Sequence, residues 1–182
     1  MDSPATPPVT VRIAAIGDLH CTRGSQGTLA PVLHHAASVA DVLALCGDLT
    51  DYGLPEEAQV LVRELAGVRA PIVAVLGNHD YESGHAVEVQ KILGGAGVTM
   101  LDGEAVELHG VGFAGVKGFA GGFGRHTLGP WGEGAIKAFV REAIDEALKL
   151  ESALARLRAH QRVALLHYSP IAATVDGEPL EI

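Results

Sequence analysis

The stretch VRIAAIGDLH at residues 11–20 combines an apolar run with an aspartate and a histidine that follow it directly. Three later stretches repeat this design: VLALCGDLT at 42–50, PIVAVLGNHD at 71–80 and VALLHYSP at 163–170. Short uninterrupted runs of β-branched residues and leucine predict strands buried on both faces, as in a sheet of parallel strands covered by other layers. We predict such strands over residues 11–16, 42–46, 72–76 and 163–166.

Helical patterns separate the first three predicted strands. Apolar residues recur at spacings of three and four over residues 29–33 and again over 58–65. The second of these segments has Pro55 near its first turn and Gly67 just past its end, which is typical of a helix start and a helix end. The alternation of strand and helix predicts an α/β fold with crossover helices.

The polar residues after the strands recur at a regular spacing. Asp18 and Asp48 lie 30 positions apart, and so do Asp48 and Asn78. This distance matches the length of a βαβ unit, roughly 30 residues. Since the spacing reflects the lengths of the elements rather than a sequence repeat, we expect the loops after successive strands to lie side by side.

The second half of the chain has a different pattern. We predict a third helix over residues 83–93 and then short strands joined by glycine turns over 98–116, which favours antiparallel pairing in a second sheet or at a sheet edge. A glycine-rich stretch at 118–132 is either a flexible surface loop or a rim over an active site. The apolar stripe over residues 133–160 predicts a long helix that packs on the core.

Composition points to a single domain without a membrane span. At 182 residues and 48% hydrophobic content, the chain can form one substantial core, which we place over residues 11–182, after a flexible tail at 1–10. No signal-peptide pattern and no apolar run near 18 residues occur, so we expect a cytoplasmic protein. With a net charge of −9, the chain is not expected to have the basic surface that nucleic-acid binding requires.

The polar residues after the strands have the chemistry of a metal site. In open α/β sheets, ligands bind beyond the carboxyl ends of the strands, so these side chains should converge. Carboxylate and imidazole ligands together suit Mn, Fe or Zn better than Ca or Mg. A glycine precedes each of the first three polar pairs and would allow a tight turn there; the three are Gly17, Gly47 and Gly77. Cys21 is also a competent metal ligand, whereas two cysteines make a disulfide framework improbable.

In this order GDLH, GDLTD, GNHD and LLHYSP resemble the successive motifs of calcineurin-like metallophosphoesterases, over residues 11 to about 171. The resemblance implies that Asp18 and His20 bind one divalent metal ion, that Asp48 bridges two, and that Asn78 and His167 bind the second. It also implies a four-layer α-β-β-α sandwich of two mixed β-sheets, with the metal site at the carboxyl ends of the strands.

A dinuclear metal site would hydrolyse phosphate esters of small molecules, either monoesters or diesters. Two cations about 3.5–4 Å apart lower the pKa of a water and hold the phosphate oxygens. The leaving oxygen needs a proton, and His79 is the best donor, with Asp80 placed to orient it. The alternative for His79 is a purely structural histidine.

Other polar residues near these motifs carry weaker signals. Thr50 and Asp51 look like turn or capping residues. Lys117 and Arg125 could contact a phosphate, although a solvated surface position is the better explanation for each of them.

One family motif has no counterpart in this sequence. Calcineurin-like enzymes carry a GHxH block whose histidines complete the two metal sites, and none follows His167. We therefore expect a truncated chain that binds metal weakly and self-associates through exposed sheet edges. A noncatalytic scaffold with the same fold is the alternative function.

Overall fold

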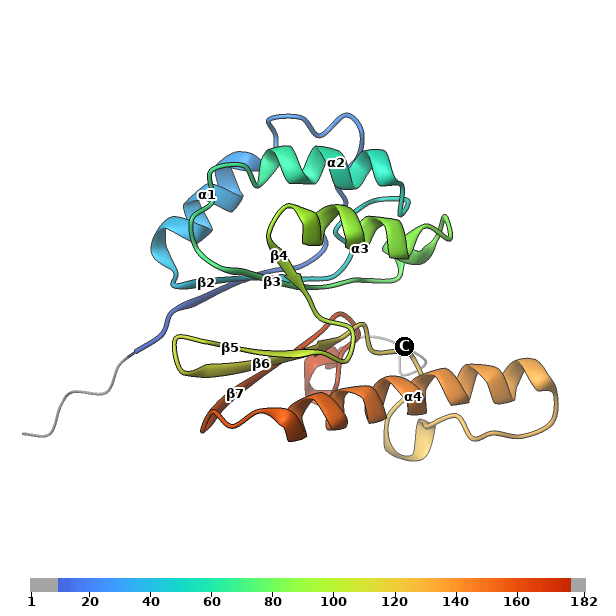
Figure 1. The fold of residues 1–182 in the computed structure, drawn as a ribbon. Coiled ribbons are helices and arrows are strands. Elements are labelled where there is room, and N and C mark those ends of the chain that lie inside the picture. The colour runs from blue at the N-terminus through green and yellow to red at the C-terminus, as the bar shows by residue number, and fades with distance from the viewer. Residues whose placement is uncertain (1–9, 178–182) are drawn as a thin grey trace, which may run out of the picture.

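The computed structural model describes residues 10–177, in which strands and helices alternate (Figure 1). The predicted tail at 1–10 lies outside the described residues except for Thr10. The strands are β1 (Ile13–Ile16), β2 (Val42–Cys46), β3 (Ile72–Val75), β4 (Val98–Met100), β5 (Ala105–Leu108), β6 (Val111–Val116) and β7 (Gln161–Leu166). The helices are α1 (Ala30–Val39), α2 (Pro55–Glu64), α3 (Ala86–Gly95) and α4 (Gly134–Arg156), and a short 3₁₀ turn, η1, spans His79–Tyr81.

The first sheet has the order β1-β2-β3-β4, and every neighbouring pair in it is parallel. The prediction of an antiparallel piece at residues 98–101 is therefore wrong, and so is the prediction that this sheet is mixed. The reason is α3, which carries the chain back across the sheet after β3, so that β4 starts at the same end as β3. Helix α2 connects β2 and β3 in the same way.

The second sheet is mixed, as expected. Strand β6 pairs antiparallel with β5 and parallel with β7. The β5–β6 connection is a tight turn through His109 and Gly110, whereas α4 forms the long crossover that parallel pairing of β6 with β7 requires.

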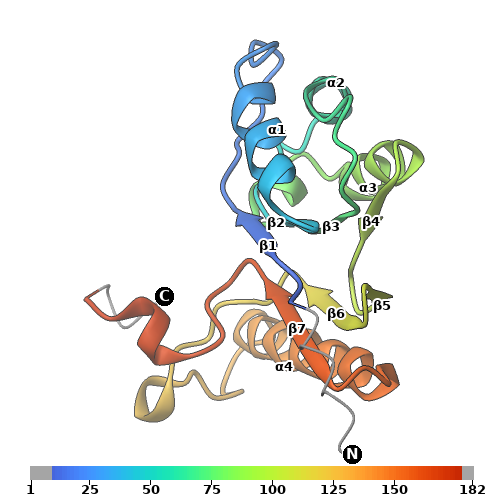
Figure 2. The same ribbon diagram turned by 90° about the vertical axis from the view of Figure 1, so that its left-hand side faces the viewer.

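Alternating side chains of the central strands fill two apolar layers. Leu43 and Leu45 of β2 point toward the helices, while Val42 and Ala44 pack against residues of the second sheet such as Phe113. Both leucines are fully buried, and full burial of a leucine stabilises the fold by about 1.5–3 kcal/mol. Figure 2 shows α1, α2 and α3 on the outer face of the first sheet and α4 on the outer face of the second.

Helix α4 is amphipathic and covers the second sheet. Ala153 and Leu157 pack with Ala114 of β6, and charged residues lie on its other face. At 23 residues it is long, but too polar for a membrane span, and no helix of the described residues is long and apolar enough to cross a membrane.

Two strands are less buried than the sequence predicted. The side chains of β1 alternate between exposed and half-buried, and Ile13 is 37% exposed. Strand β7 is also largely exposed. Among the described strands each is the outermost of its sheet, which explains why one side lacks a covering neighbour.

Candidate metal centre

Parallel pairing continues past the strands and aligns the first two polar loops. The backbone N–H of Asp18 donates to the carbonyl of Gly47 (3.1 Å), and that of His20 donates to the carbonyl of Asp48 (2.9 Å). An isolated bridge between Cys21 and Thr50 extends this register. The loop after β1 is therefore fixed beside the loop after β2.

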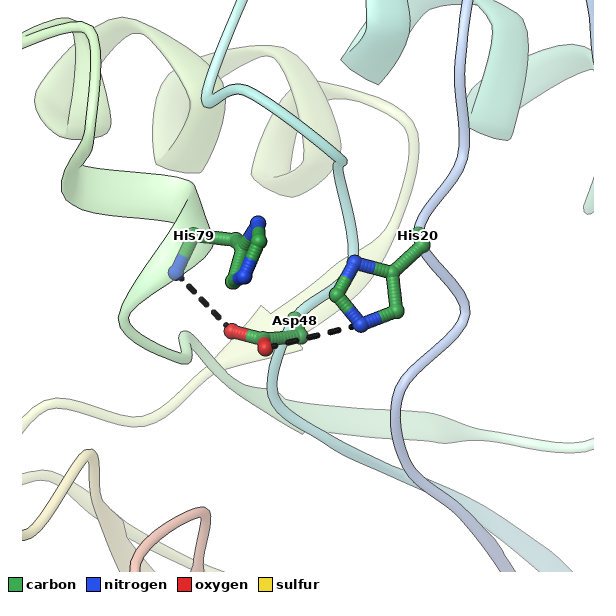
Figure 3. Close-up of side chains that lie close together, drawn as sticks. All are labelled: His20, Asp48 and His79. Atoms are coloured by element: carbon green, nitrogen blue, oxygen red, sulfur yellow. Dashed lines mark hydrogen bonds and ion pairs between the residues drawn. The ribbon is translucent and has the colours of Figure 1, made fainter.

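Two groups of metal-ligand side chains meet at these loops, and Asp48 belongs to both. One group contains His20, Asp48 and His79; the other contains Asp18, Asp48 and His167. Within each group the ligand atoms lie within 4.8 Å of one another. Figure 3 shows the first group: the His20 ring and the backbone N–H of His79 approach Asp48 from different loops.

The two carboxylate oxygens of Asp48 face different partners. Oδ2 lies 3.7 Å from Nε2 of His20, and Oδ1 lies 3.4 Å from Nε2 of His167. Oδ1 also accepts a hydrogen bond of 3.0 Å from the backbone N–H of His79. Since Asp48 is only 4% exposed, its carboxylate is held in one orientation between these groups.

His167 is oriented as metal-binding histidines usually are. Its Nδ1 lies 3.2 Å from the carbonyl oxygen of Cys46, which can only accept, so Nδ1 carries the proton. Its Nε2 lies 2.9 Å from Oδ1 of Asn78. A ligating histidine typically donates its other ring N–H to a carbonyl or carboxylate in this way.

The grouping of ligands differs from the expected one. Asp18 was expected beside His20, but the structure groups it with His167 instead. The backbone register explains this, because Asp18 is bonded to Gly47, and Gly47 lies against the His167 ring. His79, expected as an acid rather than a ligand, lies in the group of His20.

The backbone is strained at three of the predicted ligands. Asp18, His20 and Asp48 have φ values of 54°, 42° and 47°. His109 is the one other non-glycine residue with positive φ in residues 10–177. A left-handed conformation costs an L-residue roughly 1–2 kcal/mol, and such strain concentrates at functional sites.

Glycine makes room for the ligands at two of the three expected positions. A Cβ at Gly47 would lie 2.5 Å from Nδ1 of His167, and a Cβ at Gly77 would overlap the Asp48 carboxylate. Gly47 also has a φ of 90°. At Gly17, by contrast, a Cβ would meet only ordinary contacts at 3.6 Å and beyond, so the expected need for glycine there is wrong.

His79 is anchored through one ring nitrogen. Its Nδ1 lies 2.7 Å from the carbonyl oxygen of Asp51 and therefore donates to it. This hydrogen bond, together with the nearby carboxylates of Asp48, Glu82 and Asp51, raises the pKa of His79 above its ordinary value, with burial acting in the opposite direction. The rings of His20 and His79 meet edge-on, with centroids 4.6 Å apart.

Asp80 does not orient His79, contrary to the sequence-based prediction. Its buried carboxylate accepts hydrogen bonds from the backbone N–H groups of Leu49, Thr50 and Gly77, and from the Thr50 hydroxyl. Burial raises the pKa of Asp80, and these hydrogen bonds oppose that shift. Asp80 therefore ties the loop after β2 to the loop after β3.

Asp51 was assigned too small a role by sequence reasoning. Its carbonyl accepts the His79 N–H, and its carboxylate lies 3.2 Å from Nδ1 of His20. One residue thus contacts both histidines of the first group. The signal in the sequence was the acidic residue three positions after Asp48 in GDLTD.

Several observations indicate that the side chains around Asp48 could bind a metal ion. Nδ1 of His20 is buried and makes no hydrogen bond, although a carboxylate oxygen of Asp51 lies 3.2 Å away. Nε2 of His167 and Oδ1 of Asn78, two atoms that can each bind a divalent metal, lie 2.9 Å apart. The glycine positions at 47 and 77 leave the space that the ligands fill.

Comparison with known families agrees with this site. The family model for calcineurin-like phosphoesterases matches residues 11–163. The chain belongs to the calcineurin-like phosphoesterases. This family generally consists of phosphoesterase hydrolases that bind divalent metal ions. No curated protein matches the sequence.

The calcineurin-like match ends before His167, so the place of that residue rests on geometry. His167 follows β7, the last strand of the described residues, and packs against Gly47 and Asn78 in the loops after β2 and β3. The two sheets of this phosphoesterase thus both contribute side chains to one centre.

The exposure of three other residues tests the weaker assignments made from the sequence. The Cys21 thiol is fully buried in the core, its Sγ lies 3.6 Å from the carbonyl of Glu57, and burial raises its pKa to about 11, so it is not among the clustered ligands. Lys117 is 8% exposed, so the expected solvated position is wrong for it. Arg125 is exposed and donates to the neighbouring His126 ring.

An apolar cavity of about 940 Å³ lies beside the centre rather than around it. Its walls come from α4, the glycine-rich segment after β6 and the residues after β7, including Phe119, Ala143, Leu150 and Tyr168. None of the predicted ligands lines it. Tyr168 connects the two, because it follows His167 and the two rings contact at 5.5 Å between centroids.

Proposed function

We propose that this calcineurin-like phosphoesterase hydrolyses phosphate esters of small molecules with two divalent metal ions of the Mn, Fe or Zn type. The observation that carries the proposal is the position of Asp48, whose two oxygens face His20 on one side and His167 on the other. A carboxylate in this position can serve two cations at once.

The proposed ligands are those predicted from the sequence. His20 lies on the Oδ2 side of Asp48, and Asn78 with His167 lies on the Oδ1 side. Asp18 is grouped with the His167 side by distance. When bound, the metal pair would supply an activated water and neutralise charge on the phosphate.

We propose His79 as the general acid. Its Nδ1 is held by the Asp51 carbonyl, which leaves Nε2 as the nitrogen that can donate to a leaving oxygen. Its side chain is 37% exposed, so a substrate can reach it. Asp51 takes the orienting role first assigned to Asp80.

The substrate is proposed to be a small molecule. The cavity of about 940 Å³ beside Tyr168 lies within the range of ordinary small-molecule sites, and its apolar walls suit the organic part of an ester. The net charge of −9 argues against nucleic acid. The expected four-layer α-β-β-α sandwich belongs to the same proposal, supported by helices on both outer faces.

The proposal is tested by metal analysis of the purified protein, followed by hydrolysis of matched phosphate monoesters and diesters with Mn²⁺ added. We expect metal-dependent turnover that stops with a chelator. A protein that binds metal but hydrolyses neither class would favour the noncatalytic scaffold, and a protein that binds no metal would overturn the site itself.

A further inference from the structure

A buried lysine next to the centre has no role in the proposed chemistry. Lys117 follows β6 directly and is 8% exposed. Its Nζ donates to the carbonyl of Gly118 at 2.9 Å and lies 3.8 Å from a carboxylate oxygen of Glu142. Burial of a charged ammonium is unfavourable unless its surroundings compensate, so this position calls for an explanation.

Three aromatic rings surround the Lys117 ammonium. Nζ lies 4.6 Å from the ring centroid of Phe119, 5.4 Å from that of Tyr168 and 5.5 Å from that of Tyr81. A cation within about 6 Å of an aromatic face is attracted by the ring, and more strongly when it is desolvated. The Lys117 ammonium therefore attracts three aromatic rings at once.

Two of these rings belong to loops that carry proposed ligands. Tyr81 ends η1, whose preceding residue is Asn78, and the N–H of Tyr81 donates to the Asn78 carbonyl at 3.1 Å. Tyr168 directly follows His167. The Lys117 carbonyl also accepts hydrogen bonds from the N–H groups of His167 (3.1 Å) and Tyr168 (3.0 Å).

Helix α4 contacts Lys117 and the residue after it through Glu142 and Glu146. Glu146 is buried, accepts a hydrogen bond from the Gly118 N–H at 2.9 Å, and pairs with Lys149 at 2.6 Å. Lys149 in turn pairs with Asp102, which follows the first sheet. Glu146 and Lys149 thus join α4 to the ends of both sheets.

We infer that Lys117 is a positioning residue that sets the distance between Asn78 and His167 by holding Tyr81 and Tyr168 against one buried cation. The inference rests on the proposed function, because it concerns the metal that these two ligands share. Asn78 and His167 lie in loops that follow strands of different sheets, and their contact of 2.9 Å depends on how the two loops are placed. A neutral side chain at position 117 removes the attraction for both tyrosine rings.

The test is Lys117→Met in the full chain, with metal affinities measured by Mn²⁺ titration followed by electron paramagnetic resonance, and with the visible spectrum of Co²⁺ at the centre. We expect one of the two metal affinities to fall by about 10–100-fold, the effect typical of residues that support ligands, while the other is unchanged. Lys117→Arg keeps the cation and its attraction for the rings, and should restore the affinity.

Leu157→Ala is the matched control. Leu157 packs at the other end of β6, against Gly112, so its truncation weakens the same interface between helix and sheet far from Lys117. We expect it to lower stability and leave both metal affinities unchanged. Loss of the same single metal in Leu157→Ala would show that general loosening, not Lys117, explains the effect.

Tyr81→Leu covers the case in which Lys117→Met does not fold. It removes one of the two rings that the inference names and keeps the lysine, and we expect a smaller loss at the same metal. Wild-type affinities in Lys117→Met or, failing that, in Tyr81→Leu overturn the inference. A wild-type protein that binds no metal would instead overturn the proposed function, so the two failures are distinguishable.

Discussion

Nε2 of His167 lies 2.9 Å from Oδ1 of Asn78, although 89 residues separate them and they follow strands of different sheets. Asp48 lies between these residues and His20, with one oxygen toward each side. The centre therefore depends on the two sheets meeting correctly, and its parts can be tested one by one.

Asp48→Ala should remove both metal ions, whereas Asn78→Ala should remove about one, because only the bridging carboxylate faces both sides. Metal counting after gel filtration measures the difference. Equal metal content in the two variants would show that Asp48 does not bridge.

His79→Ala should keep the metal ions and lower turnover by about 10²–10⁴-fold for alkyl phosphates, the usual contribution of a general acid. Nitrophenyl phosphates should lose much less, because nitrophenolate leaves without a proton. Steady-state rates with both substrates measure this, and His126→Ala, an exposed histidine, is the control. Loss of metal from His79→Ala would instead identify His79 as a ligand of the group with His20.

Gly47→Ala should destabilise the protein by about 1–3 kcal/mol and weaken metal binding, because position 47 has φ of 90° and its Cβ would press on His167. Urea unfolding and metal titration measure the two effects. Gly17→Ala is the matched control, since a Cβ there has ordinary contacts. If both substitutions are equally tolerated, the close approach at Gly47 is not needed.

Asp80→Asn should destabilise the metal-free protein by about 1–3 kcal/mol for each backbone N–H that then faces an amide NH₂ instead of an oxygen. The carboxylate now accepts four hydrogen bonds from two loops, and an asparagine cannot accept on both sides. Urea unfolding measures the change, with Asp145→Asn, a surface ion-pair residue, as the control. Unchanged stability would mean that the Asp80 hydrogen bonds contribute little.

Cys21 should react slowly with thiol reagents in the folded protein. With its pKa raised to about 11 by burial, roughly 0.1% of the thiol is ionised at pH 8. The pKa of Cys21 is higher in the folded protein than in the unfolded chain. Below about pH 9 this thiol therefore leaves the free energy of unfolding unchanged, and as the pH rises from 9 toward 11 that free energy falls. In Cys46→Ser, reaction with a disulfide reagent should need urea; fast reaction without urea would contradict the burial of Cys21.

Much of the first sheet could be predicted from sequence, because the apolar runs that form β2 and β3 are buried on both faces and end in polar loops. The direction of β4 could not, since it depends on α3 crossing the sheet rather than on residues 98–100. The convergence of Asp18, Asp48 and His167 followed from the position of loops at the ends of parallel strands.

The partners of individual side chains could not be predicted. Asp80 and Asp51 both lie close to His79, and only the three-dimensional path of the loops shows that the Asp51 carbonyl, not the Asp80 carboxylate, holds the ring. Lys117 likewise follows an apolar strand, and nothing in its neighbours indicates that α4 and two tyrosine-bearing loops enclose it.

The left-handed backbone conformations of Asp18, His20 and Asp48 lower the stability of the fold at positions where the proposed function needs these side chains. Glycine would adopt the same φ at each position without strain, so Asp18→Gly or His20→Gly relieves the backbone while deleting a proposed ligand. Random mutation selected only for thermal tolerance would therefore drift toward glycine at these positions and lose the centre, whereas selection for turnover must retain a less stable chain.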